Sequence, residues 1–415
     1  MAKVITTELQ HSGASGANIT LDSSKNVTCE NNLQVDGNVT VTGTLPADKL
    51  TGALPAISGA SLTGVTDTLS FRNIVTNGAM QINQRGDKTG ITSAQFGGPD
   101  RWKTNVGSCG TWSISKSTDS PDGFGNSLKW DCTTADASPA AGDVCFIESR
   151  YEGQDLQHLE WGTSGAKSLT LSFWIKCNKT GNIAVCFWQL NSQRMITKTA
   201  TISSANTWEK KTITIPGDTG GSGFTNDNAG RFQLEFWFDG GSNFQGGSNA
   251  DRWGAEAANR RGNGETLALA DSTSNALYIT GIQMEVGSTA TDYEHRSYGD
   301  ELARCQRYYY RHVDGTNQPV GIGQQYSGTN CSCNIDFPVS MRTSSPAIDA
   351  TSGGDYYYIY GNGNSSGIDG ALSLWMKSEN AGFVEGTNDS DIGGGLGTRW
   401  ISNNAAAYIA FNAET

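Results

Sequence analysis

The chain has 415 residues, of which 17% are charged and 52 are glycine. Its 29 basic and 41 acidic residues give a net charge of -12, which argues against the phosphate backbone of a nucleic acid as the main ligand. The length suits two to four domains of about 100 to 200 residues, and the low charge with abundant glycine favours turn-rich β structure.

Targeting signals and disulfides are not expected. The start MAKVITTELQ lacks the apolar segment of a signal peptide, and no stretch approaches the roughly 18 apolar residues of a membrane span. Nine scattered cysteines, an odd number, are typical of small buried apolar residues in a chain folded in a reducing cytoplasm. A protein of this kind that acts outside the cell would leave by lysis or in a particle.

The amino-terminal part predicts elements that cannot stand alone. Residues 19–42 alternate apolar and polar in short bursts, which indicates short strands. The stretch TGTLPADKLTGALPAISGASLTG (42–64) then repeats itself after nine residues, and its prolines and glycines preclude a long helix or a central strand. A short repeat without a partner element indicates a unit that stacks on copies of itself, for example from neighbouring chains.

From residue 71 onward the pattern predicts a two-sheet β-sandwich. SLTLSFWIKC (168–177) and FQLEFWFD (232–239) alternate strictly, with apolar side chains on one face and polar ones on the other. Similar strands are expected at 111–117, 143–151, 183–190, 207–215 and 276–286, separated by glycine-rich loops. Many strands with few helices favour a sandwich.

The carboxyl-terminal third predicts one short helix and a small β domain. DELARCQRYYY (300–310) has an apolar stripe of Leu302, Cys305 and Tyr309, with Asp300 as the expected cap. About 100 residues of short strands follow, including YYYIY (356–360) and AAAYIAF (405–411).

Motifs for catalysis and metal binding are few. Cys331 and Cys333 have the spacing of two residues on one face of a strand rather than that of a zinc site. Glu148, Glu235 and Glu285 lie in predicted strands, where a solvated carboxylate is the norm, although they leave a two-carboxylate glycosidase open. The loops 217–231 and 239–253 are rich in Gly, Asn and Asp and leave Ca²⁺ open, but their ligand spacing does not match an EF-hand and flexible turns are favoured. We expect no metal and no cofactor.

Four segments carry a resemblance to a known family. They are FRNIVTNGAMQINQRG (71–86), PDRWKT (99–104), WEKKTITIPGDTGGSGFTNDN (208–228) and ITGIQMEVGSTATDYEHRSYGDELARCQRYYYR (279–311). Together they resemble the carbohydrate-binding-module-like domain of bacteriophage tail fibre proteins over residues 71–311. The last hundred residues match no such pattern.

This resemblance implies an all-β, homotrimeric virion fibre that attaches to a bacterial surface glycan through a jelly-roll sandwich. The expected parts are a virion-anchoring segment of short strands (1–41), a fibre shaft and linker (42–70), the jelly roll (71–298), a connecting helix (299–311) and a β domain at the tip (312–415). In the shaft, equivalent apolar side chains of three chains would meet around a threefold axis. These side chains are Leu45, Leu50, Leu54, Ile57 and Leu62.

The glycan is expected to bind exposed aromatic side chains, since a flat ring beside hydrogen-bonding groups is a good platform for a sugar. The candidates are Tyr356, Tyr357, Tyr358 and Tyr360 in the terminal domain and Trp174 and Trp237 in the sandwich. For the two tryptophans a trimer contact or a cover over the sheet is the alternative. For the whole chain, the alternatives are a polysaccharide-cleaving tailspike and a capsid decoration or connector fibre without a receptor site.

Overall fold

The chain divides into two compact units, Met1–Val65 and Thr66–Thr415. The computed structural model describes residues 72–247, 251–393 and 395–414, together with three short strands of the first unit. These strands, β1 (Glu8–Leu9), β2 (Ile19–Leu21) and β3 (Val27–Cys29), pair into one antiparallel sheet. The five expected shaft residues, from Leu45 to Leu62, lie outside the described residues.

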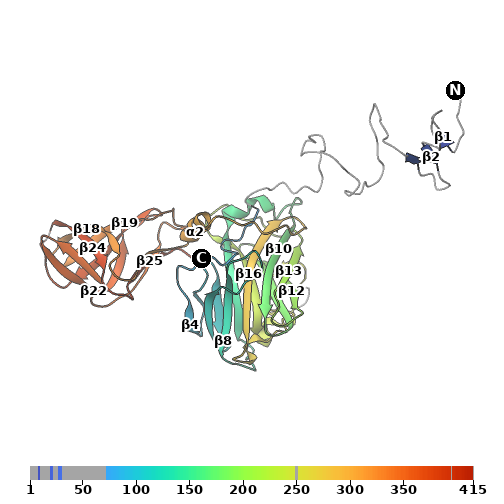
Figure 1. The fold of residues 1–415 in the computed structure, drawn as a ribbon, viewed down its shortest axis with the longest axis horizontal. Coiled ribbons are helices and arrows are strands. Elements are labelled where there is room, and N and C mark those ends of the chain that lie inside the picture. The colour runs from blue at the N-terminus through green and yellow to red at the C-terminus, as the bar shows by residue number, and fades with distance from the viewer. Residues whose placement is uncertain are drawn as a thin grey trace. The chain divides into compact units, whose positions relative to one another are not determined.

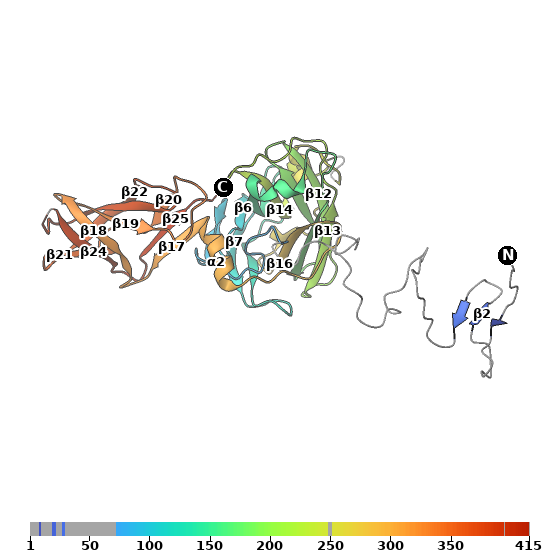
Figure 2. The same ribbon diagram turned by 90° about the horizontal axis from the view of Figure 1, so that it is seen from above.

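The second unit begins with a sandwich of two antiparallel sheets; Figure 1 shows strands of one sheet side by side, and Figure 2 shows the two layers from above. The six-stranded sheet has the order β13-β10-β16-β8-β7-β4, and the seven-stranded sheet has the order β15-β12-β11-β14-β9-β6-β5. The strands of the first are β4 (Lys88–Ile91), β7 (Thr111–Ser117), β8 (Ser127–Thr134), β10 (Leu169–Cys177), β13 (Glu209–Ile215) and β16 (Ala276–Val286). Those of the second are β5 (Gln95–Phe96), β6 (Lys103–Gly107), β9 (Val144–Glu152), β11 (Gly181–Gln189), β12 (Arg194–Ile202), β14 (Gly230–Gly240) and β15 (Gly254–Ala255).

The core of the sandwich comes from the alternation that the sequence shows. Leu169, Leu171, Phe173 and Ile175 of β10 are fully buried, as are all four apolar residues of the inner face of β14. Successive side chains of a strand point to opposite faces, so one half of each strand faces the other sheet. The prediction of a mostly β sandwich is therefore confirmed.

Short helices connect and cover the strands. They are η3 (Gly153–Leu159), η4 (Ser242–Phe244), α1 (Ala258–Arg261), η5 (Leu269–Asp271) and α2 (Tyr298–Gln306). In α2 the predicted bounds and cap are wrong. Ser297, not Asp300, is the N-cap and accepts a hydrogen bond from the backbone nitrogen of Asp300, whose carboxylate instead lies in the first turn, where the helix dipole favours it. The helix ends before the tyrosine run, because Tyr309 and its neighbours pair as a strand with β25.

The remaining strands form a three-stranded sheet and a closed barrel. The sheet has the order β17-β25-β20, and the barrel the order β18-β19-β23-β22-β21-β24, whose labelled strands group together in Figure 2. The sheet strands are β17 (Tyr309–Asp314), β20 (Ala347–Ala350) and β25 (Tyr408–Asn412). The barrel strands are β18 (Pro319–Ser327), β19 (Asn330–Asp336), β21 (Tyr357–Gly361), β22 (Asn364–Trp375), β23 (Ala381–Asn388) and β24 (Leu396–Ser402).

The described cysteines are buried in the apolar cores, as expected for small apolar residues. All eight cysteines described are free and buried, including Cys331 and Cys333, which point into the same core on β19. Among the described residues, no helix has the length and hydropathy needed to cross a membrane.

Candidate functional site

The outer face of the seven-stranded sheet carries a network of hydrogen-bonded charges. Glu235 on β14 and Glu148 on β9 are direct cross-strand neighbours. The side-chain nitrogen of Gln233 donates to both carboxylates, at 2.7 Å to Glu148 and 2.5 Å to Glu235. Arg261 from α1 donates to Glu235 at 3.1 and 2.5 Å, and Arg150 donates to the oxygen of Gln233 at 2.8 Å. The charged and polar side chains of this network are therefore paired with one another.

This face is covered, so it does not present an open groove at the network. Glu235 and Trp237 are completely buried and Glu148 is 3% exposed. The ring of Trp237 stacks on that of Phe146, with centroids 4.3 Å apart, and the ring centroid of Phe244 from η4 lies 5.0 Å from that of Trp237. Alternation correctly places Trp237 on the outer face, but η4 and α1 then cover it.

The expectation that Glu235 is solvated is wrong for the same reason. Burial raises the pKa of Glu148, because its charged form loses water, with Arg150 opposing the shift. In Glu235 the buried charge is matched by the guanidinium of Arg261. The pair has the residue types of a glycosidase, but neither carboxylate is open to a substrate.

Glu265, which follows α1, makes stability depend on pH. Burial raises its pKa from 4.5 to about 8. Between these values the folded chain holds a proton that the unfolded chain releases, so the free energy of unfolding falls as pH rises. The variant Glu265→Gln tests this pH dependence. Its side chain cannot ionise, and its amide oxygen can still accept the hydrogen bond from the backbone nitrogen of Ala268. We expect this variant to be more stable than the parent by about 1–3 kcal/mol at pH 8 and equal to it near pH 4.5. Denaturant titrations at both values measure this, and an equal gain at both would contradict it.

Trp174 lies on the outer face of the six-stranded sheet and is half-buried. Its strand pairs with β16 through a bulge between Ser172 and Trp174. Gly281 of β16 has φ +60° there, and a Cβ atom on it would lie 3.0 Å from Cδ1 of Trp174 and 2.7 Å from the ring of Phe124. The indole is therefore packed against backbone along part of its surface.

The tyrosine run 356–360 divides between the inside and the outside of the barrel. Tyr357 is 1% exposed, and its hydroxyl donates to the carbonyl of Tyr408 at 2.6 Å, so it belongs to the core. Tyr356 precedes β21 and is half-buried against that core. Tyr358 and Tyr360 alternate onto the outer face, are half-buried, and have ring centroids 6.3 Å apart.

Polar groups surround these two outer rings. The hydroxyl of Tyr358 donates to Asp355 at 2.8 Å, and the guanidinium of Arg399 on β24 lies 5.0 Å from the ring centroid of Tyr360. Asp389, after β23, completes a set that we call the tyrosine face: Tyr358, Tyr360, Asp355, Asp389 and Arg399. A tilted pair of rings beside both charge signs can bind a ligand that has apolar and hydroxyl faces.

A glycine keeps the tyrosine face open. Gly367 on β22 is the cross-strand partner of Tyr358. A Cβ atom on Gly367 would lie 2.7 Å from a carboxylate oxygen of Asp389 and 2.8 Å from one of Asp355. A glycine inside a strand often marks a place where another group approaches closely. Here it leaves room for the two carboxylates to converge beside the ring.

Neighbouring carboxylates affect the pKa values of Asp389 and Tyr358. A hydrogen bond to Asp369, together with the charges of Asp369 and Asp355, raises the pKa of Asp389. The hydrogen bond to Asp355 raises the pKa of the Tyr358 hydroxyl, which therefore stays protonated and donates. The face offers hydrogen-bond acceptors from its carboxylates and donors from Arg399.

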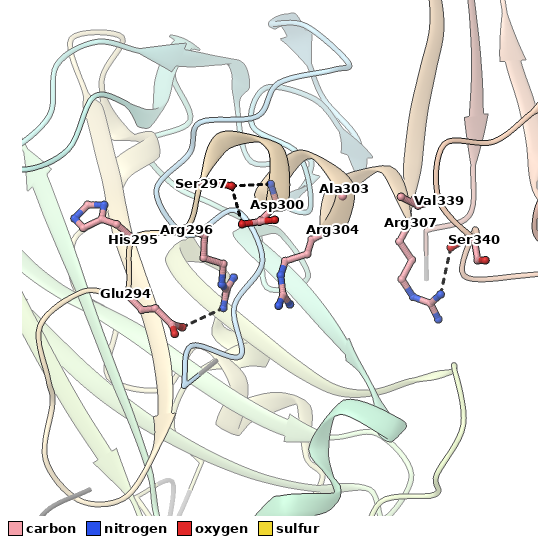
Figure 3. Close-up of a pocket in the computed structure, with 10 residues that line it drawn as sticks. All are labelled: Glu294, His295, Arg296, Ser297, Asp300, Ala303, Arg304, Arg307, Val339 and Ser340. Atoms are coloured by element: carbon pink, nitrogen blue, oxygen red, sulfur yellow. Dashed lines mark hydrogen bonds and ion pairs between the residues drawn. The ribbon is translucent and has the colours of Figure 1, made fainter. Parts of the chain in front are cut away.

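A cavity of about 570 Å³ lies beside α2 and is shown in Figure 3. Its charged side chains already have partners: Arg296 pairs with Glu294 and Glu301, and Arg307 donates to the carbonyl of Ser340 at 3.3 Å. The lining has no tyrosine or tryptophan. We therefore assign it a structural role at the start of the helix.

Metal ligands do not gather in the described residues, where no group of three histidine, cysteine or carboxylate side chains could hold an ion. Both aspartates of the loop 217–231 form ion pairs. Asp218 binds Arg194 at 2.7 Å, and Asp227 pairs with Arg231. These carboxylates fix the loop instead of leaving ligands for Ca²⁺.

Several solved structures are similar to part of this chain. About half of this chain, 52%, is similar to the enzymatically active domain of tailspike protein 4 of bacteriophage CBA120, at 12% identity and a TM-score of 0.26, and it covers 21% of that chain. A family 4 carbohydrate-binding module has 14% identity and a TM-score of 0.26 over 51% of this chain and 97% of its own. The family 11 module from Clostridium thermocellum has 13% identity and a TM-score of 0.24, with 50% and 98% covered.

No protein-family model and no curated protein matches the sequence. The chain spans about a fifth of the tailspike chain. The structural similarity is one of mostly β folds, and the ligands of those proteins are not transferred by it.

Sequence reasoning found the two rings of the tyrosine face but not its charged members. Asp389 and Arg399 reach β21 only because the barrel closes through β24 and β23. It also did not single out Trp208, which lies 6.3 Å from Tyr278 on the outer side of the six-stranded sheet with Lys176 above both rings. The signal for that cluster was present as alternating aromatic and basic residues on neighbouring strands.

Proposed function

We propose that this chain is a non-enzymatic attachment protein that binds a bacterial surface polysaccharide as part of a trimeric bacteriophage tail fibre. The observation that carries the proposal is the tyrosine face, on which two outward rings lie beside carboxylates and a guanidinium. Sugar rings have apolar faces that pack on aromatic side chains and hydroxyl edges that need acceptors and donors.

The sequence supports placing this site in a trimeric virion protein. The resemblance of residues 71–311 to tail fibre domains favours a virion protein that is made in the host cytoplasm, and the repeat at 42–64 favours assembly with neighbouring chains. In a homotrimer three weak sites act together through their effective concentration. The amino-terminal strands would then join other virion proteins, with no role for nucleic acid, a cofactor or membrane insertion.

The competing function from the enzyme class is a polysaccharide-cleaving tailspike. The carboxylates Glu148 and Glu235 are the observation that favours it, since both bond to one nitrogen of Gln233. Their burial disfavours it, because a glycosidase needs water and substrate at both groups. Incubation with host polysaccharide followed by a reducing-end assay separates the two functions.

Replacing Tyr358 tests the attachment function. We expect Tyr358→Ala to lower adsorption of the purified protein to host cells about tenfold or more, since stacking on an aromatic ring contributes about 1 kcal/mol per site and a trimer multiplies it. Its melting temperature should change little, because the ring is outside the barrel core. A cell-binding assay and a thermal melt measure the two effects.

Tyr298→Ala is the matched control, because Tyr298 is an exposed tyrosine, 61% accessible, on the helix α2 and not on the barrel strands that carry the tyrosine face. It should adsorb as the parent does. If Tyr358→Ala adsorbs as well as the parent, the tyrosine face is not the site of attachment. Absence of adsorption by the parent protein would instead favour a capsid decoration or connector fibre.

A further inference from the structure

A second, smaller cavity has the composition of a binding site for an anion. It has a volume of about 320 Å³ and is lined by the edge strands β4 and β5 of the sandwich and by all three strands of the β17-β25-β20 sheet. Its lining includes Arg85, Lys88 and Arg311 but a single carboxylate, Asp349. The lining therefore presents three cationic side chains, two of which also contact a carboxylate outside it, Arg85 with Glu414 and Arg311 with Asp314.

Arg85 is held rigidly in this cavity. Its guanidinium lies 3.7 Å from the ring centroid of Tyr309 and 4.7 Å from that of Phe96, and its side chain is 7% exposed. Its two polar contacts are long, 3.3 Å to Glu414 and 3.5 Å to the amide oxygen of Asn412. A planar guanidinium fixed between rings is pre-organised to donate to a carboxylate.

Arg311 has hydrogen-bonding capacity left over. One terminal nitrogen binds Asp314 at 2.7 Å, and the guanidinium lies 4.5 Å from the ring centroid of Tyr408. Its Nε atom is buried and has no hydrogen-bond partner among the described residues. A buried donor without a partner is costly, and a bound acceptor would remove that cost. Lys88 is exposed and adds a mobile charge at the cavity.

Asp349 supplies the opposite chemistry. It accepts hydrogen bonds from the hydroxyls of Tyr309, at 3.0 Å, and Tyr408, at 2.9 Å. A carboxylate has about four lone-pair sites, so about two remain for hydroxyl groups of a ligand. The same negative charge opposes a doubly charged phosphate.

We propose that this cavity binds one carboxylate-bearing sugar unit, of the uronic acid type. The sugar carboxylate would take the N–H groups of Arg85 and Arg311 and the charge of Lys88, while its hydroxyls would donate to Asp349. The volume is at the lower end for ligand pockets and suits one ring rather than an oligosaccharide. None of these residues belongs to the tyrosine face, so this site goes beyond the proposed function.

The test is calorimetric titration of the full chain with sodium glucuronate, with glucose, sodium acetate and inorganic phosphate as separate arms. We expect glucuronate to bind at least about tenfold more tightly than each of the other three, which corresponds to about 1.4 kcal/mol or more. Acetate or phosphate binding as tightly as glucuronate would show a general anion site, and glucose binding as tightly would remove the role of the carboxylate. Either result overturns the proposal.

Variants locate the binding. Lys88→Glu changes an exposed side chain and should weaken glucuronate binding about tenfold or more without changing the melting temperature. Arg311→Gln should abolish detectable binding. The matched control is Lys129→Glu, on β8, which should bind as the parent does. Tyr358→Ala should also bind glucuronate normally, so failure here and failure of the tyrosine face are separate results. Full binding by Lys88→Glu and Arg311→Gln would overturn the assignment.

Discussion

Arg261→Ala is expected to lose about 3–5 kcal/mol of the free energy of unfolding, because it leaves a buried carboxylate without its counter-charge. Glu235 is completely buried, and Arg261 donates to it from two nitrogens. The same guanidinium lies 5.0 Å from the ring centroids of Phe146 and Trp188 and 5.2 Å from that of Trp237. The variant therefore also removes packing from the cover over this sheet.

A double-mutant cycle separates the charge from the packing. Glu235→Gln removes the buried charge, so Arg261→Ala in that background should cost less than in the parent. Lys167→Ala is the control, since its ion pair with Glu160 has side chains 45% and 50% exposed and should contribute at most about 1 kcal/mol. Urea denaturation measures the parent, the two single variants, the double variant and the Lys167→Ala control. Equal losses for Arg261→Ala and Lys167→Ala would contradict a buried ion pair.

The strands of the sandwich could be predicted because their signal is local. Phe232, Leu234 and Phe236 repeat every second residue, and this period alone fixes the face that enters the core. The cover over the opposite face could not be predicted in this way. It is made by η4 and α1, elements of three and four residues, which are too short to show a helical period.

In the candidate site, too, some residues could be predicted from a local pattern and others could not. Alternation in β21 predicts that Tyr358 and Tyr360 share a face, and it also predicts that Tyr357 does not. The carboxylate of Asp389 and the guanidinium of Arg399 come from segments 30 to 40 residues later in the sequence. Their approach depends on barrel closure, which is set by strand pairing and not by any local pattern.

At the tyrosine run that follows α2, the local helical pattern is overridden by pairing with a distant strand. The apolar stripe predicts that the helix continues through Tyr310, but Tyr309 pairs with Asn412 and Tyr310 with Phe411 in β25. Aromatic residues favour strands when a partner strand is present. That partner lies about 100 residues away, so the sequence near the helix does not contain the deciding information.

Glu414 joins this sheet to the sandwich through buried charges. Its carboxylate pairs with Arg101, and both side chains are 3% exposed. The guanidinium of Arg101 also lies 3.4 Å from the ring centroid of Tyr308, whose hydroxyl donates to Glu152 at 2.5 Å. Arg307 binds the same Glu152 at 2.8 and 2.7 Å. The contacts thus connect residues from both ends of the second unit.

Glu414→Ala is therefore expected to cost about 3–5 kcal/mol, because Arg101 would remain buried without a carboxylate. We expect calorimetry to show the single transition of the parent separating into two, as the sandwich and the strands after α2 lose their coupling. Glu414→Gln keeps a hydrogen-bond acceptor, so its free energy of unfolding should lie between those of the parent and Glu414→Ala. Asp314→Ala is the control, since the carboxylate of Asp314 is 70% exposed and its pairing with Arg311 should contribute at most about 1 kcal/mol. If Glu414→Ala and Asp314→Ala melt alike, the buried pair does not couple the two parts, because removing a partner from a desolvated charge must cost more than removing one from a solvated charge.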